Sequence, residues 1–279
     1  MSAAEEVSVH LLGASPRRPR RVAIGTFDGV HVGHRRVIAG ADTVLTFSPH
    51  PRAVIGESPA LLTEIDARID LLAGCGVSEV VLIPFDRAFA QIAPQRFIDE
   101  VLVGELGAVE VAIGSDFRFG RRGSGGVGDL RADQRFRTRV EPLLLREGDV
   151  VSSTRIRSLV EAGDVEAAAR LLERKFRILC RPLPDVDPDR LSIPWPDDLV
   201  RPAPGVYSVA VLGPRGEDAG RVPGEMTIAE DGVLLLPERG IEFSGPVTIE
   251  LSRRLFSEPG DIERALRVET SPQAGCRAG

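Results

Sequence analysis

Short apolar runs alternate with amphipathic stretches through the first two thirds of the chain. Runs typical of buried strands predict strands at residues 22–25, 43–47, 79–83, 110–114 and 139–144. Segments with apolar residues three and four positions apart predict helices from residue 34 and at 64–73, 94–106, 153–162 and 165–172. Strand, helix and strand at this spacing imply a parallel sheet with right-handed crossovers, so we expect an α/β domain over residues 1–174.

The pattern changes after residue 173. Residues 182–204 are crowded with proline and aspartate, which disfavours regular helix and predicts a linker or an irregular wall. Short β-rich runs follow at 205–212, 232–236 and 247–251, separated by Gly and Pro. They predict a second domain over residues 175–279, a small barrel or sandwich, with a terminal helix at 258–266 and frayed last residues.

Composition narrows the class of protein. The 279 residues carry a net charge of −6 with scattered basic residues, so a free nucleotide is a better candidate ligand than nucleic acid. The N-terminus has acidic residues where a signal peptide would be basic, and no apolar run approaches the ~20 residues of a membrane span, which predicts a cytoplasmic protein. Cys75, Cys180 and Cys276 are far apart and odd in number, which fits a reducing compartment. Lys175 is the only lysine, and the chain has no asparagine.

The most informative segment is GTFDGVHVGH at residues 25–34. It joins a predicted strand to a predicted helix, which is where nucleotides bind in α/β sheets. Because Gly25, Gly29 and Gly33 lack a Cβ, backbone amides can approach a polyphosphate closely. His31 and His34 lie on one face of a helical turn, so both imidazoles can donate hydrogen bonds to one phosphate chain and stabilise its transition state.

Zinc ligation and ordinary surface histidines are the two other interpretations of this pair. No cysteine lies near the histidines, and the sequence supplies no obvious third ligand, which disfavours zinc. Phosphate binding is therefore the preferred interpretation, and we expect no metal held by the protein itself.

Three further segments combine ring-binding and charged residues. TFSPHP at 46–51 follows the second strand, where Phe47 and His50 could meet a planar ring or simply belong to a proline-stiffened loop. GSDFRFG at 114–120 interleaves aromatic and charged side chains, which suits a ring with a sugar or phosphate, or an ordinary turn. VSSTRIR at 151–157 places hydroxyls and arginines at a helix start, where they can bind phosphate or only cap the helix.

These four segments, in this order, resemble the adenylyltransferase domain of the bacterial bifunctional riboflavin kinase/FAD synthetase family. The resemblance covers about residues 20–174, including the helical ending EAGDVEAAARLLER. The HxGH motif alone would indicate only the wider nucleotidyltransferase superfamily, whereas the four segments together point to FMN as acceptor. The resemblance implies a Rossmann-like parallel-sheet nucleotidyltransferase domain, with ATP and FMN as partners and Mg²⁺ entering with ATP.

Carried over by position, the resemblance implies catalytic roles for His31, His34 and Arg157. It further implies contacts with ATP or flavin by Gly25, Thr26, Phe27, Asp28, Gly33, Phe47, Pro49, Pro51, Asp116, Ser153 and Thr154. Two features depart from the family pattern: the helix after His34 is very short, and Asp116 stands where the family often has asparagine. A carboxylate there would repel phosphates unless Mg²⁺ or Arg118 compensates it.

The second domain resembles the family's riboflavin kinase barrel only in part. The matching segments are APGVYSVAV at 203–211 and VTIELSRRLFSEPGDIERAL at 247–266. The family's glycine-rich stretch ending in Pro-Thr-Ala-Asn belongs just before residue 203, but this chain has DPDRLSIPWPDDL at 187–199 and no asparagine. The sequence thus predicts an FAD synthetase with a small β-barrel-like domain that has lost kinase activity. The alternatives are a nucleotidyltransferase for another phosphate-bearing acceptor or using CTP, and a non-catalytic flavin-binding homologue.

Overall fold

The structure, a computed structural model, describes residues 7–56, 59–184, 190–213, 221–230, 232–238 and 245–266. Its contacts divide the chain into two units. The first contains Met1–Leu159, Ala167–Lys175 and Pro196–Val200, and the second contains Val160–Glu166, Phe176–Trp195 and Arg201–Gly279. The predicted boundary after residue 174 lies beside the passage from Lys175 to Phe176, and two shorter stretches cross that boundary. Cys276, the last residues predicted to fray and residues 185–189 lie outside the described residues.

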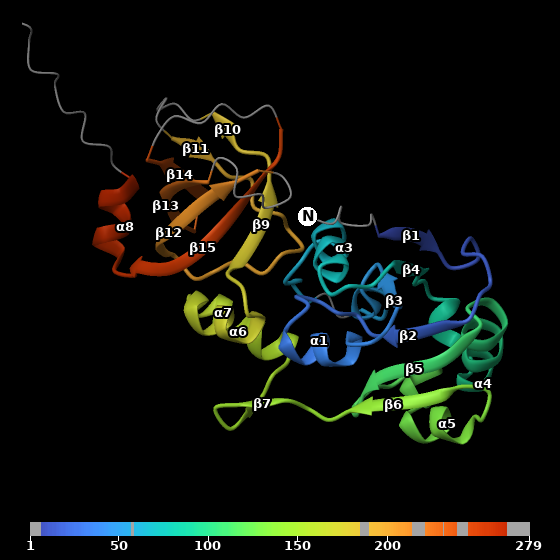
Figure 1. Cartoon of the computed structure of the whole chain (residues 1–279). Coiled ribbons are helices and arrows are strands. Elements are labelled where there is room, and N and C mark those ends of the chain that lie inside the picture. Colours follow the sequence, from blue (N-terminus) through green and yellow to red (C-terminus); the bar gives the residue numbers. More distant parts are fainter. Residues whose placement is uncertain are drawn as a thin grey trace, which may run out of the picture. The chain divides into compact units, whose positions relative to one another are not determined.

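The first unit is built on a six-stranded parallel sheet, which confirms the predicted α/β architecture (Figure 1). Its strands are β1 Ser8–Leu11, β2 Arg20–Ile24, β3 Thr43–Ser48, β4 Glu79–Pro84, β5 Ala108–Gly114 and β6 Arg137–Glu141. Their spatial order is β1-β4-β3-β2-β5-β6. The chain adds β3 and β4 on one side of β2 and then β5 and β6 on the other, so the strand order reverses at β2. Ligands bind at such a switch point in α/β sheets.

Alternating strand residues build a core on each face of this sheet. On one face, Val22, Leu45 and Val111 belong to a cluster with residues of the segments that cross behind the sheet. On the other face, Ala23 and Val44 belong to a second cluster with the helices there. Figure 1 shows helices on both sides of the sheet, so its strands are buried as their apolar sequences require.

The helices predicted to accompany this sheet are present, with one difference in geometry, and two short helices, α2 and α5, were not predicted. The helices are α1 Val32–Ile38, α2 Pro51–Val54, α3 Ile65–Ala73, α4 Pro94–Arg96, α5 Val127–Ala132, α6 Ser153–Glu161 and α7 Val165–Leu172, with 3₁₀ turns η1 Phe89–Gln91 and η3 Arg121–Gly123. The helix predicted at 94–106 begins as α4 but continues as the π-helical segment η2 Phe97–Glu105. Its apolar residues are buried in this wider turn as they would be in an α-helix, so their spacing did not distinguish the two.

Two strand predictions in the first unit need correction. β1 was not predicted because Val9 and Leu11 lie exposed at the sheet edge, so no buried apolar run marks it. The strand predicted at 139–144 is β6, which ends at Glu141 because Pro142 cannot donate to a sheet ladder. A short hairpin of β7 Leu145–Arg146 and β8 Asp149–Val150 follows it.

A buried ion cluster fixes the amino ends of β2, β3 and β4. Arg20 is fully buried and donates to both carboxylate oxygens of Glu79, at 2.8 and 3.0 Å. Burial by itself would raise the pKa of Glu79, but hydrogen bonds from Arg20 and Ser15 and the charges of Arg20 and Arg18 lower it to about 2. The cluster ties together three strand ends opposite the edge where a ligand would bind.

The second unit is a seven-stranded antiparallel sheet that curls into a half-barrel (Figure 1). Its strands are β9 Phe176–Cys180, β10 Leu183–Pro184, β11 Leu191–Ser192, β12 Gly205–Leu212, β13 Val222–Ala229, β14 Gly232–Pro237 and β15 Val247–Phe256, and α8 Pro259–Leu266 follows. The predicted strands at 205–212, 232–236 and 247–251 are confirmed as β12, β14 and β15. β13 was missed because Pro223 and Gly224 interrupt its pattern.

The linker predicted at 182–204 is partly ordered. It contains β10 and β11, and Pro196–Val200 belongs to the first unit, where Leu61 and Leu199 form a parallel bridge. Within the described residues, no helix is long and apolar enough to cross a membrane.

Candidate functional site

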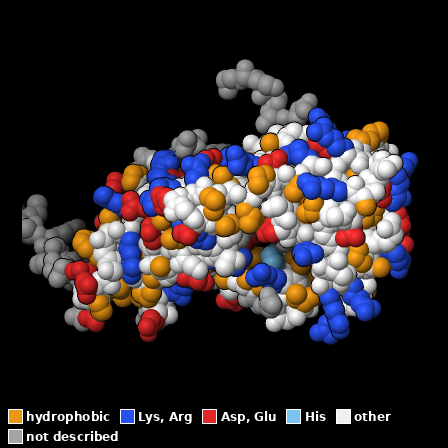
Figure 2. All heavy atoms as spheres, turned by 90° about the horizontal axis from the view of Figure 1, so that it is seen from below, with side chains coloured by type: hydrophobic (Ala, Val, Ile, Leu, Met, Phe, Trp, Pro, Cys, Tyr) orange, Lys and Arg blue, Asp and Glu red, His pale blue; other side chains and the backbone are white. Residues whose placement is uncertain are grey.

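A cavity of about 660 Å³ opens at the carboxyl ends of the parallel strands of the first unit. It is lined by segments that follow β2, β3, β4, β5 and β6 and by the start of α6. Figure 2 shows a histidine side chain within a hollow, with basic side chains at its edge. The predicted site residues that line the cavity are Gly25, Thr26, Phe27, His31, Gly33, His34, Phe47, Pro51, Asp116, Ser153, Thr154 and Arg157. Asp28 and Pro49 do not line it.

His31 and His34 form one stacked pair at this cavity. Their ring centroids lie 3.5 Å apart with an interplanar angle of 17°. The His31 Nδ1 accepts a hydrogen bond from the backbone N–H of His34, at 3.2 Å. Nδ1 is therefore the unprotonated nitrogen of the neutral His31 ring, and its proton lies on Nε2, where it can be donated to a ligand.

Both imidazoles are neutral at pH 7. Burial lowers the pKa of His31 to about 4, and the charge of Arg174 acts in the same direction. Burial, followed by the charges of His31 and Arg68, also lowers the pKa of His34. The buried His31 excludes the alternative of ordinary surface histidines, and the described residues contain no group of three or more His, Cys, Asp or Glu that could hold a metal.

Glycine is required at two positions of the loop because the backbone there lies close to other side chains. A Cβ on Gly33 would lie 3.1 Å from Cε1 and 3.2 Å from Nδ1 of His31, so a side chain there would press on the imidazole. Gly29 has φ +80°, and a Cβ would lie 2.7 Å from Cδ1 of Leu62. The glycine spacing thus sets the position of the histidines as well as access to the backbone.

Asp28 supports the loop from behind the cavity wall. It is 1% exposed, and its carboxylate accepts hydrogen bonds from the backbone N–H groups of Leu62 (2.9 Å) and Thr63 (3.1 Å). Burial raises its pKa, against the opposing effects of the Leu62 amide and of the charges of Arg68 and Arg157. The structure gives Asp28 an anchoring task, and its contact with ATP stays a prediction.

The start of α6 joins this loop at the cavity. Ser153 Oγ donates to the Asp28 carbonyl at 2.8 Å, while Ser152 Oγ accepts from the Arg155 N–H at 3.2 Å and caps the helix. The Arg157 Nε lies 3.7 Å from Asp28 Oδ2 and makes no hydrogen bond among the described residues. Three site residues were predicted in this segment. Thr154 and Arg157 line the cavity without a side-chain hydrogen bond among the described residues, whereas the Ser153 hydroxyl is already bonded.

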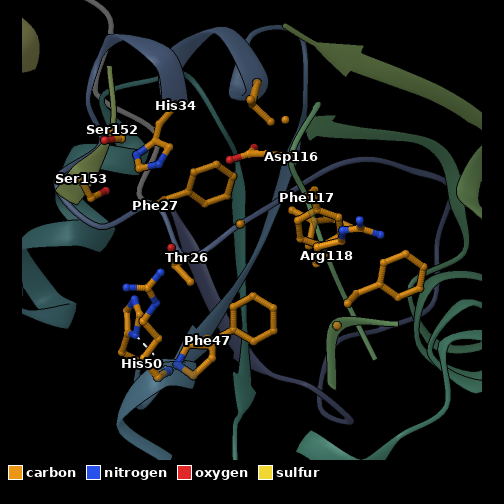
Figure 3. Close-up of a pocket in the computed structure, with 18 of the residues that line it drawn as sticks. Thr26, Phe27, His34, Phe47, His50, Asp116, Phe117, Arg118, Ser152 and Ser153 are labelled. Atoms are coloured by element: carbon orange, nitrogen blue, oxygen red, sulfur yellow. Dashed lines mark hydrogen bonds between the residues drawn. The ribbon is translucent and has the colours of Figure 1, made fainter. Parts of the chain in front are cut away.

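The other end of the cavity is aromatic. Phenylalanines from β3, the segment after β4, η1, η2 and the segment after β5 form a continuous series of ring contacts, with centroid separations of 5.3 to 6.3 Å: Phe47, Phe85, Phe89, Phe97, Phe119 and Phe117. In Figure 3, Phe47 and His50 lie at one side, while Phe27, His34 and Asp116 lie near one another at another. One cavity therefore combines an apolar surface for a flat ring with polar groups suited to phosphate.

His50, which the sequence offered as a partner for a planar ring, lines the cavity. Its Nδ1 accepts from the Arg52 N–H at 3.2 Å, and burial, with the charges of Arg68, Arg157 and Arg52, lowers its pKa to about 4. Three other residues at or behind the cavity were not predicted. Phe85 and Phe89 follow β4, and their position after a predicted parallel strand could have identified them. Nothing in the sequence distinguishes Arg68, a fully buried residue of α3, from a solvent-exposed helical arginine.

Comparison with known proteins places the chain in a family. The sequence profile of the FAD synthetase family matches residues 14–155. A bifunctional riboflavin kinase/FMN adenylyltransferase of Escherichia coli strain K12 is 32% identical over 228 residues, which cover 74% of this chain and 72% of that protein. This chain belongs to the FAD synthetase family.

One further relative is similar to the chain in sequence, and one solved structure is similar in fold. A bifunctional riboflavin kinase/FMN adenylyltransferase of Bacillus subtilis is 33% identical over 173 residues, or 56% of this chain and 54% of the relative. A crystal structure titled as a macrolide-efflux protein from Streptococcus pneumoniae superposes with a TM-score of 0.77 at 21% identity, covering 90% of this chain and all of that one, and shows the fold. Membership of the FAD synthetase family makes the chain an enzyme of the nucleotidyltransferase class.

Proposed function

We propose that this FAD synthetase family member transfers AMP from MgATP to FMN, which gives FAD and pyrophosphate. The observation that carries the proposal is the two-ended cavity, with six linked phenylalanines at one end and the His31–His34 pair at the other. FMN is a flat ring that ends in a phosphate, so it matches both ends of such a cavity. The names of the two relatives support the same acceptor.

The chain's own groups act by positioning and hydrogen bonding. A phosphate oxygen of FMN attacks the α-phosphorus of ATP, the bond from that phosphorus to the bridging oxygen breaks, and pyrophosphate leaves with it. The His31 Nε2–H and an imidazole N–H of His34 donate to phosphate oxygens whose charge grows in the transition state. Arg157, at the start of α6, adds a fixed positive charge on the same wall. No covalent enzyme intermediate is involved.

Mg²⁺ belongs to the substrate MgATP. Two carboxylates, Asp116 and Glu141, line the cavity, and Glu141 already accepts from Arg139 at 2.5 Å. Because Mg²⁺ is commonly held by one or two carboxylates together with substrate phosphates, this donor set fits an ion that arrives on the triphosphate.

We further propose that riboflavin kinase activity is lost. Two observations support this. The chain contains no asparagine, so it cannot supply the asparagine of the Pro-Thr-Ala-Asn motif. In the stretch that stands in its place, Leu199 and Val200 are engaged in the first unit, where the Val200 N–H donates to the Leu61 carbonyl at 2.8 Å.

Both proposals are tested by incubating the purified protein with MgATP and either FMN or riboflavin, followed by chromatography of the flavins. We expect FAD and pyrophosphate from FMN and no product from riboflavin. Parallel reactions with CTP and with other phosphate monoesters test the alternative acceptors and nucleotides. FMN formed from riboflavin would contradict the loss of kinase activity, and tight FMN binding without pyrophosphate release would favour a non-catalytic flavin binder.

A further inference from the structure

Arg68 is a deeply buried arginine of the first unit. It lies on α3, is 2% exposed and does not line the cavity. Its Nη1 donates to the Thr26 carbonyl at 2.7 Å, and its Nε has no hydrogen-bond partner among the described residues. It forms no salt bridge with any carboxylate in the described part of the chain. Arginine is almost never fully buried unless it is paired, so this position requires a reason.

The charges behind the loop do not cancel. Asp28 is the carboxylate whose charge acts on Arg68, and the same carboxylate faces Arg157 at 3.7 Å. Two guanidinium groups thus share one carboxylate, whose oxygens already accept backbone amides. A net positive charge is left behind the cavity wall, where an arriving triphosphate would compensate it.

The charge of Arg68 also acts on two histidines of the cavity, His34 and His50. The charged or titratable groups that act on His34 are His31 of the same helix and Arg68 of α3. Those that act on His50 are Arg68, Arg157 of α6 and Arg52 of its own helix. All of them oppose protonation of the imidazoles.

We propose that Arg68 is a positioning residue for adenylyl transfer, which fixes the glycine loop through the Thr26 carbonyl and supplies an uncompensated positive charge to the phosphate end of the cavity from behind its wall. The proposal rests on the proposed function and adds to it a residue that touches neither substrate. An arginine with a purely structural role would hold the Thr26 carbonyl but would influence neither the pH dependence of kcat/KM nor the binding of anions.

The kinetic test compares Arg68→Met, which removes the charge, with Arg68→Lys, which keeps it. We expect Arg68→Met to lower kcat/KM for ATP roughly 10–100-fold, because misplacement at a distance from the chemistry has effects of this size. We also expect the acid limb of its kcat/KM profile to move to higher pH, since His34 and His50 protonate more easily. Arg68→Lys should restore the wild-type position of the acid limb and part of the rate. Losses that are equal in both variants, with an unchanged pH profile, would overturn the proposal.

A second readout does not depend on FAD formation. Inorganic tripolyphosphate should raise the melting temperature of the wild-type protein, and Arg68→Met should reduce this shift by more than half. Arg17→Met is a matched control, because Arg17 also donates to backbone carbonyls, those of Gly104 and Val103, but none of these residues lines the cavity. It removes one positive charge from the first unit and should leave the tripolyphosphate shift intact. If the wild type makes no FAD, the proposed function fails, while an undiminished shift in Arg68→Met overturns the role of Arg68 independently.

Discussion

Two neutral imidazoles define the phosphate end of the cavity at the scale of single residues. His31 and His34 stack on each other, and the bond from the His34 N–H to His31 Nδ1 leaves the His31 Nε2–H as donor. Neutral donors need no partner carboxylate, and a carboxylate beside them would compete with the anionic substrate. The same burial that keeps them neutral ties the stability of the protein to pH.

The first prediction concerns this pH dependence. His31 has a pKa of about 4 in the folded protein against an ordinary value of 6.5, so the unfolded chain binds its proton first as pH falls. The neutral, buried His31 therefore makes its full contribution to the free energy of unfolding above about pH 6.5. This contribution decreases as pH falls toward 4, by at most about 1.4 kcal/mol per pH unit. His34 contributes in the same direction. Denaturant unfolding at a series of pH values measures the slope.

The variant His31→Gln/His34→Gln provides the comparison. Its slope between about pH 6.5 and 5 should be smaller than that of the wild type, because two titrating groups are removed. Glu79 does not interfere, since its stabilising effect is lost only below its ordinary value of 4.5, toward a folded pKa of about 2. Equal slopes in the two proteins would show that the histidines are not buried in their neutral form.

A second prediction at this scale concerns Asp116. It is exposed in the cavity beside the phosphate end, so its carboxylate should repel an ATP molecule that carries no Mg²⁺. We expect Asp116→Asn to tighten binding of Mg²⁺-free ATP several-fold and binding of MgATP less. Calorimetric titration with and without Mg²⁺ measures both. Weaker binding in both conditions would indicate that Asp116 contacts the ligand favourably.

The loop between β2 and α1 is positioned, at the scale of elements, by partners from distant segments. Its carbonyl groups accept hydrogen bonds from Arg68 at Thr26, from Ser153 at Asp28 and from Arg174 at Gly29. The Asp28 side chain attaches the same loop to the start of α3 through the amides before it. α1 itself has only seven residues, so these attachments, more than the helix, hold the histidines in place.

The third prediction tests this attachment. Asp28→Ala would leave the buried N–H groups of Leu62 and Thr63 without acceptors, which costs about 1–3 kcal/mol of stability for each group. Denaturant unfolding should show this loss, and FAD formation by the folded fraction should also fall. Asp28→Asn keeps one carbonyl oxygen and should be less destabilised. A free energy of unfolding equal to wild type in Asp28→Ala would contradict an anchoring role.

Patterns within single elements allowed much of this architecture to be predicted. The strands from β2 to β5 are buried apolar runs, and β2, β3 and β5 each end at a segment whose residue types suggested ligand chemistry. Patterns did not reveal β1, whose apolar residues are exposed, or the π-helical turn of η2, which buries the same residues as an α-helix would. Arg68 and the anchoring contacts of Asp28 depend on residues more than 30 positions away, which no local pattern encodes.

At the scale of the whole first unit, the two edges of the parallel sheet at which its strands begin and end differ in character. The amino ends of its central strands are closed by the buried Arg20–Glu79 cluster, and the carboxyl ends surround the cavity. Four segments spread from residue 25 to residue 157 meet at the carboxyl ends because parallel strands all end on one edge. The second unit has the half-barrel expected of the family, and its loss of kinase chemistry stays a proposal.

The rate of FAD formation from MgATP and FMN, compared between the wild type and the single variants His31→Ala and His34→Ala, tests the central claim most directly. The variants should unfold at about the wild-type denaturant concentration or slightly below it. Their turnover should fall by roughly 10²–10³-fold, the size expected when a transition-state hydrogen-bond donor is lost. Near-normal FAD formation by both folded variants, or none by the wild type, would contradict the assignment of adenylyl transfer to this cavity.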